Sequence, residues 1–569
     1  MSSQDKIYTD YFYHEVDFDK NHFRYQELHI PAGVAPAPLA VPPVLKPDKV
    51  DGNDVWFTIE SQAGESQILP GHKTKTWGYN APLLGQTLVL KTGQHVHVAL
   101  KNSLPELTTY HWHGMEVPGP ITDGACHAPV YPGETKNIEF TVNQPAALTW
   151  LHAHPCPSTA AQVWMGLAMG VVVTDDNEAK LPIPKSYGVD EFPIILQDRS
   201  FHEDNQLDYE RDYDPMGVFG NVPMINGVVR PYVDVTTQKV RLLFLGGSNR
   251  REWRLHFDKD LVMTQIAGDD SFLAHPVKMT KLLVGPGERL QVVVDFKDYH
   301  DGDVVNLYTD DFKLISFKIH QFEPDYSVIP DTLFEPVDPV VDRDREIRYI
   351  TMDEHNMMNG KQFSMSRIDL KTEVGKAEYW DVKNTNTSDQ GMLHPFHIHG
   401  GHFLVISRNA HEPNPNEIGV YKDTVEVAPK ETVRIKVFYP LTGIFMYHCH
   451  VIEHEDAGMM AQIQVYDPKE PDKHYHLMDM ATLTKAFAEE RGIKESEVWM
   501  PGMCTEGFGP EPTTSASTGA SMHHEHHAMK MAMPHHEVNA SSGASKHEAP
   551  KPVVTPHHEP DTSSAASHH

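Results

Sequence analysis

The sequence predicts an all-β protein built from three copies of one β-sandwich unit. The segments V-Y-P-G-E, V-G-P-G-E and V-A-P-K-E each precede a run that alternates like a β-strand. Their prolines stand at positions 132, 286 and 429, so the copies lie 154 and 143 residues apart. A turn followed by a strand that recurs at domain-sized spacing indicates repeated domains. The chain length of 569 residues agrees, because domains of about 150 residues allow three or four of them.

These repeats divide the chain. Residues 1–50 form an N-terminal extension with a proline-rich lead-in, and the three units cover residues 51–180, 181–335 and 336–506. From residue 507 onward, Ser, Thr, Ala, Pro, Gly and His dominate. Such a composition cannot bury enough apolar surface to fold. We therefore expect residues 507–569 to be a disordered tail.

Two histidine pairs in the first unit are candidate metal ligands. His111 and His113 flank a tryptophan, and His152 and His154 flank an alanine. Side chains alternate across a strand, so both imidazoles of a pair lie on one face. A single pair could be a coincidence. Further pairs are therefore needed to indicate a metal site.

The middle unit has no such pair. Where the other units carry H-W-H-G and H-P-F-H-I-H-G, it has E-W-R-L-H-F at residues 252–257. We expect this unit to be a spacer without a metal site.

Two blocks of the third unit add two more candidate pairs and a thiol. In the first block, His397 and His399 share a face, and His394 faces the other way. In the second block, an apolar strand at 443–447 continues into His448, Cys449 and His450. Cys449 therefore points away from the two histidines beside it.

These residue types suit copper. A turn after the strand could return His454 and Met459 to the Cys449 side, and His394 could join them. A thiolate, two imidazoles and a weak axial thioether are the ligands of a blue-copper site. The four pairs supply eight further imidazoles, which fit three more ions, with two ligands on one ion and three on each of the others.

The four blocks resemble the copper motifs of the multicopper oxidases, the group that contains laccases, bilirubin oxidases and bacterial cuprous oxidases. The resemblance covers nearly the whole chain before the tail. It implies cupredoxin-like Greek-key sandwiches, with a three-copper cluster between the first and third units and four copper ions per chain. The implied type 1 ligands are His394, Cys449, His454 and Met459. The implied type 2 ligands are His111 and His397, and the implied type 3 ligands are His113, His152, His154, His399, His448 and His450.

The resemblance also implies a reaction. Electrons enter one at a time at the type 1 copper, near His454, which should have the more exposed imidazole edge of that site. They pass through Cys449 and its neighbouring histidines to the cluster, where dioxygen is reduced to water. Asp123 and Glu455 stand at positions where relatives place proton-carrying acids, although either could instead be a structural hydrogen-bond acceptor.

The electron donor stays open. A laccase-like enzyme would oxidise phenols or aromatic amines, and a metallo-oxidase would oxidise Cu(I) or Fe(II). A third hypothesis is a copper-sequestering protein, because residues 522–536 are rich in His and Met and these side chains bind Cu(II) and Cu(I), respectively.

Charge and hydropathy limit the other partners. The net charge of −31 disfavours nucleic acid, and no apolar run approaches the roughly 20 residues of a membrane helix. We expect a monomer. Residues 1–8 show no secretory signal, which predicts a cytoplasmic location, or an extracellular or cell-surface one if this chain is a mature form.

The four cysteines are Cys126, Cys156, Cys449 and Cys504. With Cys449 assigned to copper, three thiols remain, and one is left over if a disulfide forms. The resemblance to fungal laccases suggests a Cys126–Cys504 bridge as one alternative. We interpret Cys156 as a small buried hydrophobic residue.

Overall fold

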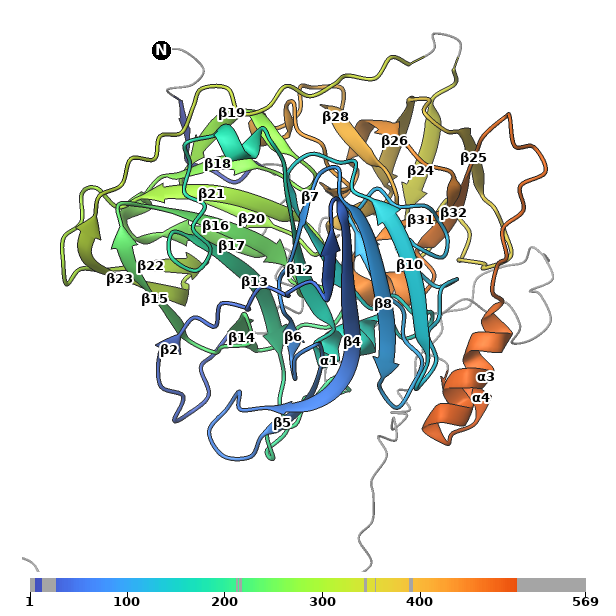
Figure 1. Cartoon of the computed structure of the whole chain (residues 1–569), viewed down its shortest axis with the longest axis horizontal. Helices are drawn as coiled ribbons and strands as arrows, with labels where there is room; N and C mark the ends of the chain where they lie inside the picture. The colour runs from blue at the N-terminus through green and yellow to red at the C-terminus, as the bar shows by residue number, and fades with distance from the viewer. Residues whose placement is uncertain are drawn as a thin grey trace, which may run out of the picture. The chain divides into compact units, whose positions relative to one another are not determined.

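The computed structural model describes residues 6–12, 27–210, 213, 217–341, 345–353, 355–387 and 392–498. The expected tail and Cys504 lie outside this part. The prediction of an all-β fold is confirmed, because six sheets pack in pairs as three sandwiches in the described part (Figure 1).

The first sandwich holds the strands from β3 to β12. One sheet has the order β10 (Thr135–Thr141), β8 (His95–Ser103), β4 (Asp54–Ser66), β5 (Thr74–Tyr79) and β6 (Leu84–Gly85), with β3 (Lys49–Asp51) paired to β4. The other has the order β7 (Leu88–Lys91), β12 (Ala168–Thr174), β11 (Ala147–His152) and β9 (His111–His113). The core between them contains Phe57, Trp112 and Met169.

The middle sandwich is built of two larger sheets. One has the order β1 (Ile7–Tyr8), β19 (Phe272–Met279), β18 (Met263–Ala267), β21 (Arg289–Asp295), β16 (Lys239–Gly246), β13 (Glu191–Arg199) and β14 (Val222–Ile225). The other has the order β2 (Ala37–Pro38), β15 (Pro231–Thr237), β23 (Phe312–Glu323), β22 (Val304–Thr309), β17 (Trp253–Phe257) and β20 (Lys281–Val284). Phe244, Trp253 and Phe317 pack between them.

The third sandwich contains β31, the strand that carries Cys449. One sheet has the order β24 (Arg348–Met352), β26 (Glu378–Asn384), β30 (Thr432–Phe438) and β28 (His402–Arg408). The other has the order β25 (Leu370–Glu373), β32 (Met460–Tyr466), β31 (Gly443–Cys449), β27 (His394–Ile398) and β29 (Thr424–Val427). Trp380, Phe396 and Tyr447 are part of the core.

The helices in the described ranges are few and short. They are α1 (Thr159–Met165), α2 (Ile452–Asp456), α3 (Met480–Arg491) and α4 (Glu495–Val498), with 3-10 turns η2 (Glu178–Lys180), η3 (Asp258–Asp260) and η4 (Pro415–Glu417). Helix α3 begins where Asp479 accepts the Thr482 N–H at 2.8 Å and ends at Gly492 with φ 66°, a conformation that glycine adopts readily. Its Leu483 and Phe487 pack against Cys126 and Cys156 of the first sandwich.

The disulfide differs from the prediction. Cys126 is bonded to Cys156, so a Cys126–Cys504 bridge is wrong, and Cys156 is buried but not a free thiol. The cause is strand pairing. Trp112 of β9 lies opposite Leu151 of β11, which brings together the loops that follow these two strands and carry the cysteines.

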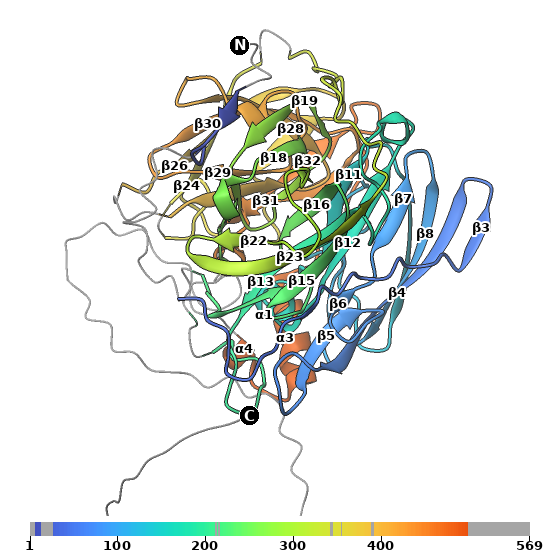
Figure 2. The same ribbon diagram turned by 90° about the vertical axis from the view of Figure 1, so that its left-hand side faces the viewer.

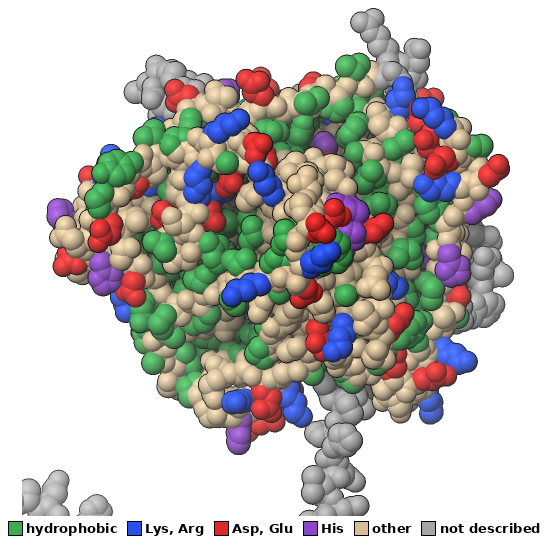
Figure 3. Space-filling model, in the orientation of Figure 1, with side chains coloured by type: hydrophobic (Ala, Val, Ile, Leu, Met, Phe, Trp, Pro, Cys, Tyr) green, Lys and Arg blue, Asp and Glu red, His purple; other side chains and the backbone are tan. Residues whose placement is uncertain are grey.

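The surface mixes charges of both signs. Acidic and basic side chains are interspersed on the face in Figure 3. No helix in the described ranges is long and apolar enough to cross a membrane.

Candidate metal centre

Strand pairing brings the histidine pairs together. In the first sandwich, His111 of β9 lies opposite His152 of β11. In the third, His397 of β27 lies opposite His448 of β31. The two sandwiches then meet, because the rings of His111 and His399 stack with their centroids 3.7 Å apart. All eight predicted imidazoles are buried. One cluster therefore forms from four sequence blocks.

The ligand atoms fall into groups. His113, His152 and His450 form one group, and His154, His399 and His448 form another, with the ligand atoms of each group within 4.8 Å of one another. His111 and His397 remain, and they also lie within this distance of His113. The family resemblance implies the same separation of His111 and His397 from the other six imidazoles, and the geometry divides those six into two groups of three.

Hydrogen bonds at one ring nitrogen orient the imidazoles so that the other nitrogen points into the cluster. His111 donates its Nδ1–H to the Asp123 carbonyl at 2.9 Å, and His397 donates to the Asp423 carbonyl at 3.0 Å. The Nε2 atoms of both rings are buried without a hydrogen-bond partner. Burying an unpaired polar atom is costly, and a hydrogen bond at one nitrogen typically orients the other toward a metal. These residues therefore fit copper ions.

Burial holds seven of these imidazoles in the ligand form. Burial, reinforced by the nearby His397 imidazole, lowers the pKa of His154 to about 3. The pKa is lowered well below its ordinary value for His111, His113, His152, His399, His448 and His450. Neutral imidazole is the form that binds metals.

A second group lies on the other face of β31. The Cys449 sulfur is 3.4 Å from His394 Nδ1 and 3.5 Å from His454 Nδ1. Met459 is buried beside it in the same hydrophobic cluster, and its carbonyl accepts the Cys449 N–H at 3.1 Å. Burial raises the pKa of the Cys449 thiol, and a coordinated metal ion would reverse that effect by stabilising the thiolate.

The expectation that His454 has an exposed edge is wrong. His454 is 0% exposed and His394 is 1% exposed. Two residues before His454, Ile452 packs in a cluster with Leu207, Tyr209 and Val218. A segment of the middle sandwich therefore covers this side of α2, which the motif alone did not indicate.

Both predicted acids lie against the imidazole cluster. Asp123 Oδ2 is 3.0 Å from His399 Nδ1, and the Glu455 oxygens are 3.2 Å from His154 Nε2 and 3.4 Å from His448 Nδ1. Burial raises the pKa of each carboxyl well above its ordinary value.

Sequence reasoning missed one ion pair at the centre. Asp423 accepts a hydrogen bond from His113 Nε2 at 3.0 Å, and Arg289 of β21 donates to Asp423 at 2.7 Å. The middle sandwich thus has no histidine pair but supplies a cation next to the cluster. The available signal was position, because Arg289 directly follows the V-G-P-G-E repeat and Asp423 shortly precedes V-A-P-K-E.

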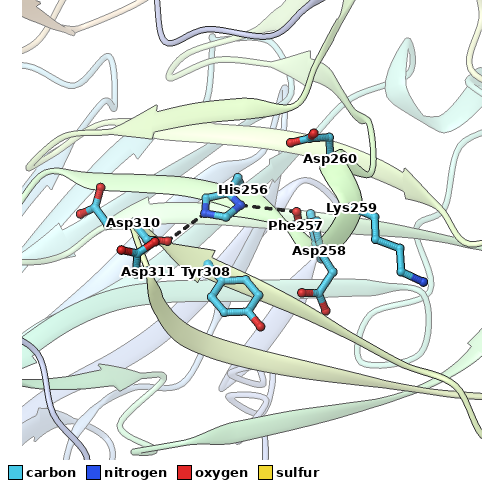
Figure 4. A pocket seen from close by; sticks show the side chains of 8 residues that line it. All are labelled: His256, Phe257, Asp258, Lys259, Asp260, Tyr308, Asp310 and Asp311. Carbon is cyan, nitrogen blue, oxygen red and sulfur yellow. Dashed lines mark hydrogen bonds between the residues drawn. The ribbon is translucent and has the colours of Figure 1, made fainter.

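A surface pocket lies elsewhere. It has a volume of about 270 Å³ and is lined by Asp258, Asp260, Asp310 and Asp311 around His256 of β17 (Figure 4). The His256 ring nitrogens lie 2.8 Å from the Asp310 carbonyl and 3.4 Å from the Phe257 carbonyl. None of its lining residues is a predicted ligand.

Known proteins resemble this chain over most of its length. Two family models, both described as multicopper oxidase, match residues 60–178 and 337–469. The multicopper oxidase mco of Staphylococcus aureus is 36% identical over 427 residues, which cover 75% of this chain and 92% of that protein. The chain belongs to the multicopper oxidase family. The multicopper oxidases bind copper, so copper is the cofactor, and the sandwiches are cupredoxin-like.

The relatives of this chain are described by different functions. A laccase from Pediococcus acidilactici has a TM-score of 0.78 and 48% identity, covering 81% of this chain and all of that one. A Campylobacter jejuni multicopper oxidase, described as a metallo-oxidase, has a TM-score of 0.67 and 25% identity, covering 78% and 98%. The cell division protein FtsP of Salmonella typhimurium is 31% identical, covering 75% and 92%.

Proposed function

We propose that this multicopper oxidase is laccase-like and couples one-electron oxidation of phenols or aromatic amines to four-electron reduction of dioxygen to water. The observation that carries the proposal is the His448-Cys449-His450 segment. Cys449 faces His394 and His454, and the histidines on either side of it belong to two different imidazole groups. One strand thus joins a thiol site to a cluster that can hold several ions.

The proposal assigns four copper ions to these groups. Cys449, His394, His454 and Met459 would hold one ion. The three imidazole groups would hold the other three, with His111 and His397 on the type 2 ion. When bound, copper supplies one-electron redox chemistry at the thiol site and oxygen reduction at the cluster.

The chain's acids have a role in the same reaction. Reduction of one dioxygen to two waters takes four electrons and four protons. We propose that Asp123 Oδ2 and the Glu455 carboxyl hold and deliver these protons. Their position supports this role, since Asp123 touches His399 and Glu455 lies beside His154 and His448.

The relatives favour an organic donor over a metal ion. The relative named a laccase is 48% identical, against 25% for the relative described as a metallo-oxidase. The short methionine stretch at residues 357–358 does not offer an obvious Cu(I) collector, because Met358 packs in the core of the third sandwich. We propose that the protein acts as a monomer.

Steady-state oxygen uptake with a phenol, Cu(I) and Fe(II), compared side by side, tests the donor. We expect the highest kcat/KM with the phenol. A higher value with Cu(I) or Fe(II) would establish the alternative, a metallo-oxidase. Uptake absent with all three donors in the copper-loaded protein would contradict an oxidase altogether and favour a non-enzymatic role.

The copper-sequestering alternative has its own test. It rests on residues 522–536, which lie outside the described residues. Deleting residues 508–569 should leave oxygen turnover per bound copper unchanged if the enzyme proposal is right. Loss of most turnover after this deletion would contradict it.

A further inference from the structure

A fifth histidine pair lies on the outer side of the first sandwich. His95 and His97 begin β8, and in the parallel pairing with β4 they lie opposite Asp54 and Trp56. On the other side of β8, Glu139 of β10 lies opposite His97. Side chains alternate across a strand, so all five point to one face, while the residues between them, such as Val96, enter the core. Strands β4 and β8 lie side by side in Figure 2.

Two imidazoles converge on one carboxylate oxygen there. Asp54 Oδ1 is 2.8 Å from His95 Nδ1 and 2.9 Å from His97 Nε2. One ligand atom from each of these three residues lies within 4.8 Å of the others. An ion can therefore reach all three without rearrangement of the backbone.

The His97 ring is held from two further sides. The Trp56 ring stacks on it with centroids 4.5 Å apart and planes 5° apart. Glu139 Oε2 lies 3.4 Å from His97 Nδ1. If Nε2 binds a metal, the proton of the neutral ring moves to Nδ1, and Glu139 is placed to accept that N–H. A carboxylate behind a ligating histidine is the usual arrangement in metal sites.

The location differs from that of the copper cluster. The side chains of His95, His97 and Asp54 are 38%, 23% and 43% exposed, whereas the eight cluster imidazoles are buried. Water can complete the coordination of an ion at the outer face.

We infer that Asp54, His95 and His97 form a separate site for a divalent cation of the Cu(II) or Zn(II) class. Two imidazoles and one carboxylate with open positions suit both ions. The bound ion would join β4 to β8, and Glu139 would orient His97 from β10. This site is additional to the four ions of the proposed oxidase and does not depend on which donor the enzyme oxidises.

Zinc binding to the copper-loaded full-length protein tests the site. Equilibrium dialysis with metal analysis should show one zinc equivalent fewer in the double variant His95→Gln/His97→Gln than in the wild type. The variant Glu139→Gln should keep the site and weaken it by about 10–100-fold. Oxygen uptake serves as the folding control and should be unchanged in both.

His320→Gln is the matched control. His320 and Asp234 form an exposed pair with a 2.8 Å contact but a single imidazole, so this variant should bind as much zinc as the wild type. The histidine-rich residues 522–536 are the same in all variants, and their binding cancels in the comparison.

Crystals soaked in zinc locate the ion. We expect an anomalous peak at the zinc edge beside Asp54 Oδ1, His95 Nδ1 and His97 Nε2. Equal zinc binding by the wild type and the double variant would overturn the inference. Equal binding would overturn the inference even if the soaked crystals show a peak, because the peak would then reflect binding at crystal concentration only.

Discussion

At the copper cluster, the tautomer of each imidazole depends on the group that accepts a hydrogen bond from its outward-facing nitrogen. His113 shows this with a charge: Asp423 accepts from its Nε2, and its Nδ1 is buried without a hydrogen-bond partner. Burial alone would raise the pKa of Asp423, but Arg289 and His113 outweigh it and hold that pKa well below its ordinary value. An ionised Asp423 therefore fixes the tautomer of His113.

The variant Asp423→Asn should lower oxygen turnover or copper affinity by about 10–100-fold, the usual cost of losing a carboxylate behind a metal-ligating histidine. The reason is that a neutral amide accepts the His113 Nε2–H more weakly than a carboxylate and no longer stabilises charge on the ring. Copper content and kcat with a phenol measure the effect. Asp381→Asn, which affects the partly exposed pair with Arg434, is the control and should change neither. Full activity in Asp423→Asn would remove Asp423 from this role.

The variant Cys449→Ser should lose the strong blue absorption and about one copper per chain, because a serine hydroxyl is a poor replacement for the thiolate of a blue-copper site. Visible spectroscopy and copper analysis of the loaded protein measure both. Cys449 is the free cysteine among the described residues, so no other described thiol can take its place. A variant that stays blue would contradict the assignment of the thiol site.

Short elements connect the two sites. Strand β31 ends at Cys449, and α2 begins three residues later, which returns His454 to the Cys449 sulfur. At the end of α2, Asp456 accepts the N–H groups of Thr159 and Ala160, which begin α1. Helix α1 follows the His152 block directly. The contact therefore ties the loop after Cys449 to the block that carries His152 and His154.

Helix α3 should make the stability of the first sandwich depend on pH. Glu490 accepts the Leu107 N–H at 2.6 Å, and burial raises its pKa from 4.5 to about 7. Above pH 4.5 the unfolded state releases this proton, while the folded state keeps it up to about pH 7. The contribution of protonated Glu490 to the free energy of unfolding is therefore full below pH 4.5 and is lost as the pH rises toward 7. The variant Glu490→Gln can still accept the Leu107 N–H, but its side chain does not titrate. The thermal unfolding midpoint of the variant minus that of the wild type should therefore increase as the pH rises from about 5 to about 8.

Scanning calorimetry at a fixed scan rate measures the difference between Glu490→Gln and wild type. The exposed Glu489 on the same helix provides the control, and Glu489→Gln should show no such trend. A difference between Glu490→Gln and wild type that stays constant with pH would contradict the role of Glu490.

Across the whole molecule, the middle sandwich does more than separate the other two. The Arg289 side chain, at the start of β21, donates hydrogen bonds to the Leu148 carbonyl of the first sandwich and to Asp423 of the third. Asp270 of the middle sandwich also pairs with it at 2.9 Å. A single buried cation thus holds all three sandwiches at the copper cluster.

The variant Arg289→Met should lower the free energy of unfolding by about 3–5 kcal/mol, because it leaves buried carboxylates without their cation. Urea unfolding of the copper-loaded protein measures the loss. Arg434→Met removes a partly exposed pair with Asp381 and should cost only about 0–1 kcal/mol. Equal effects of the two variants would show that the Arg289 network adds nothing to an ordinary ion pair.

The sequence allowed prediction of the ligand blocks because strand geometry is local. His448 and His450 share a face of β31 whatever surrounds them, and the same holds for His111 and His113. Three features could not be predicted: the Cys126–Cys156 bond, the Arg289–Asp423 pair and the burial of His454. Each depends on which strands or sandwiches meet, and contacts between distant residues leave no periodic pattern in the sequence.

The sequence by itself determined the all-β repeat, the copper chemistry and the thiol strand that joins two sites, because residue type and alternation along a strand are sufficient for these. Tertiary structure alone decided what surrounds them. It placed Arg289 from the middle sandwich behind the cluster, and it covered α2 with Leu207, Tyr209 and Val218. It also set Asp54 beside His95 and His97 on the outer sheet. The reason is that burial and charge pairing arise only when separate segments pack together.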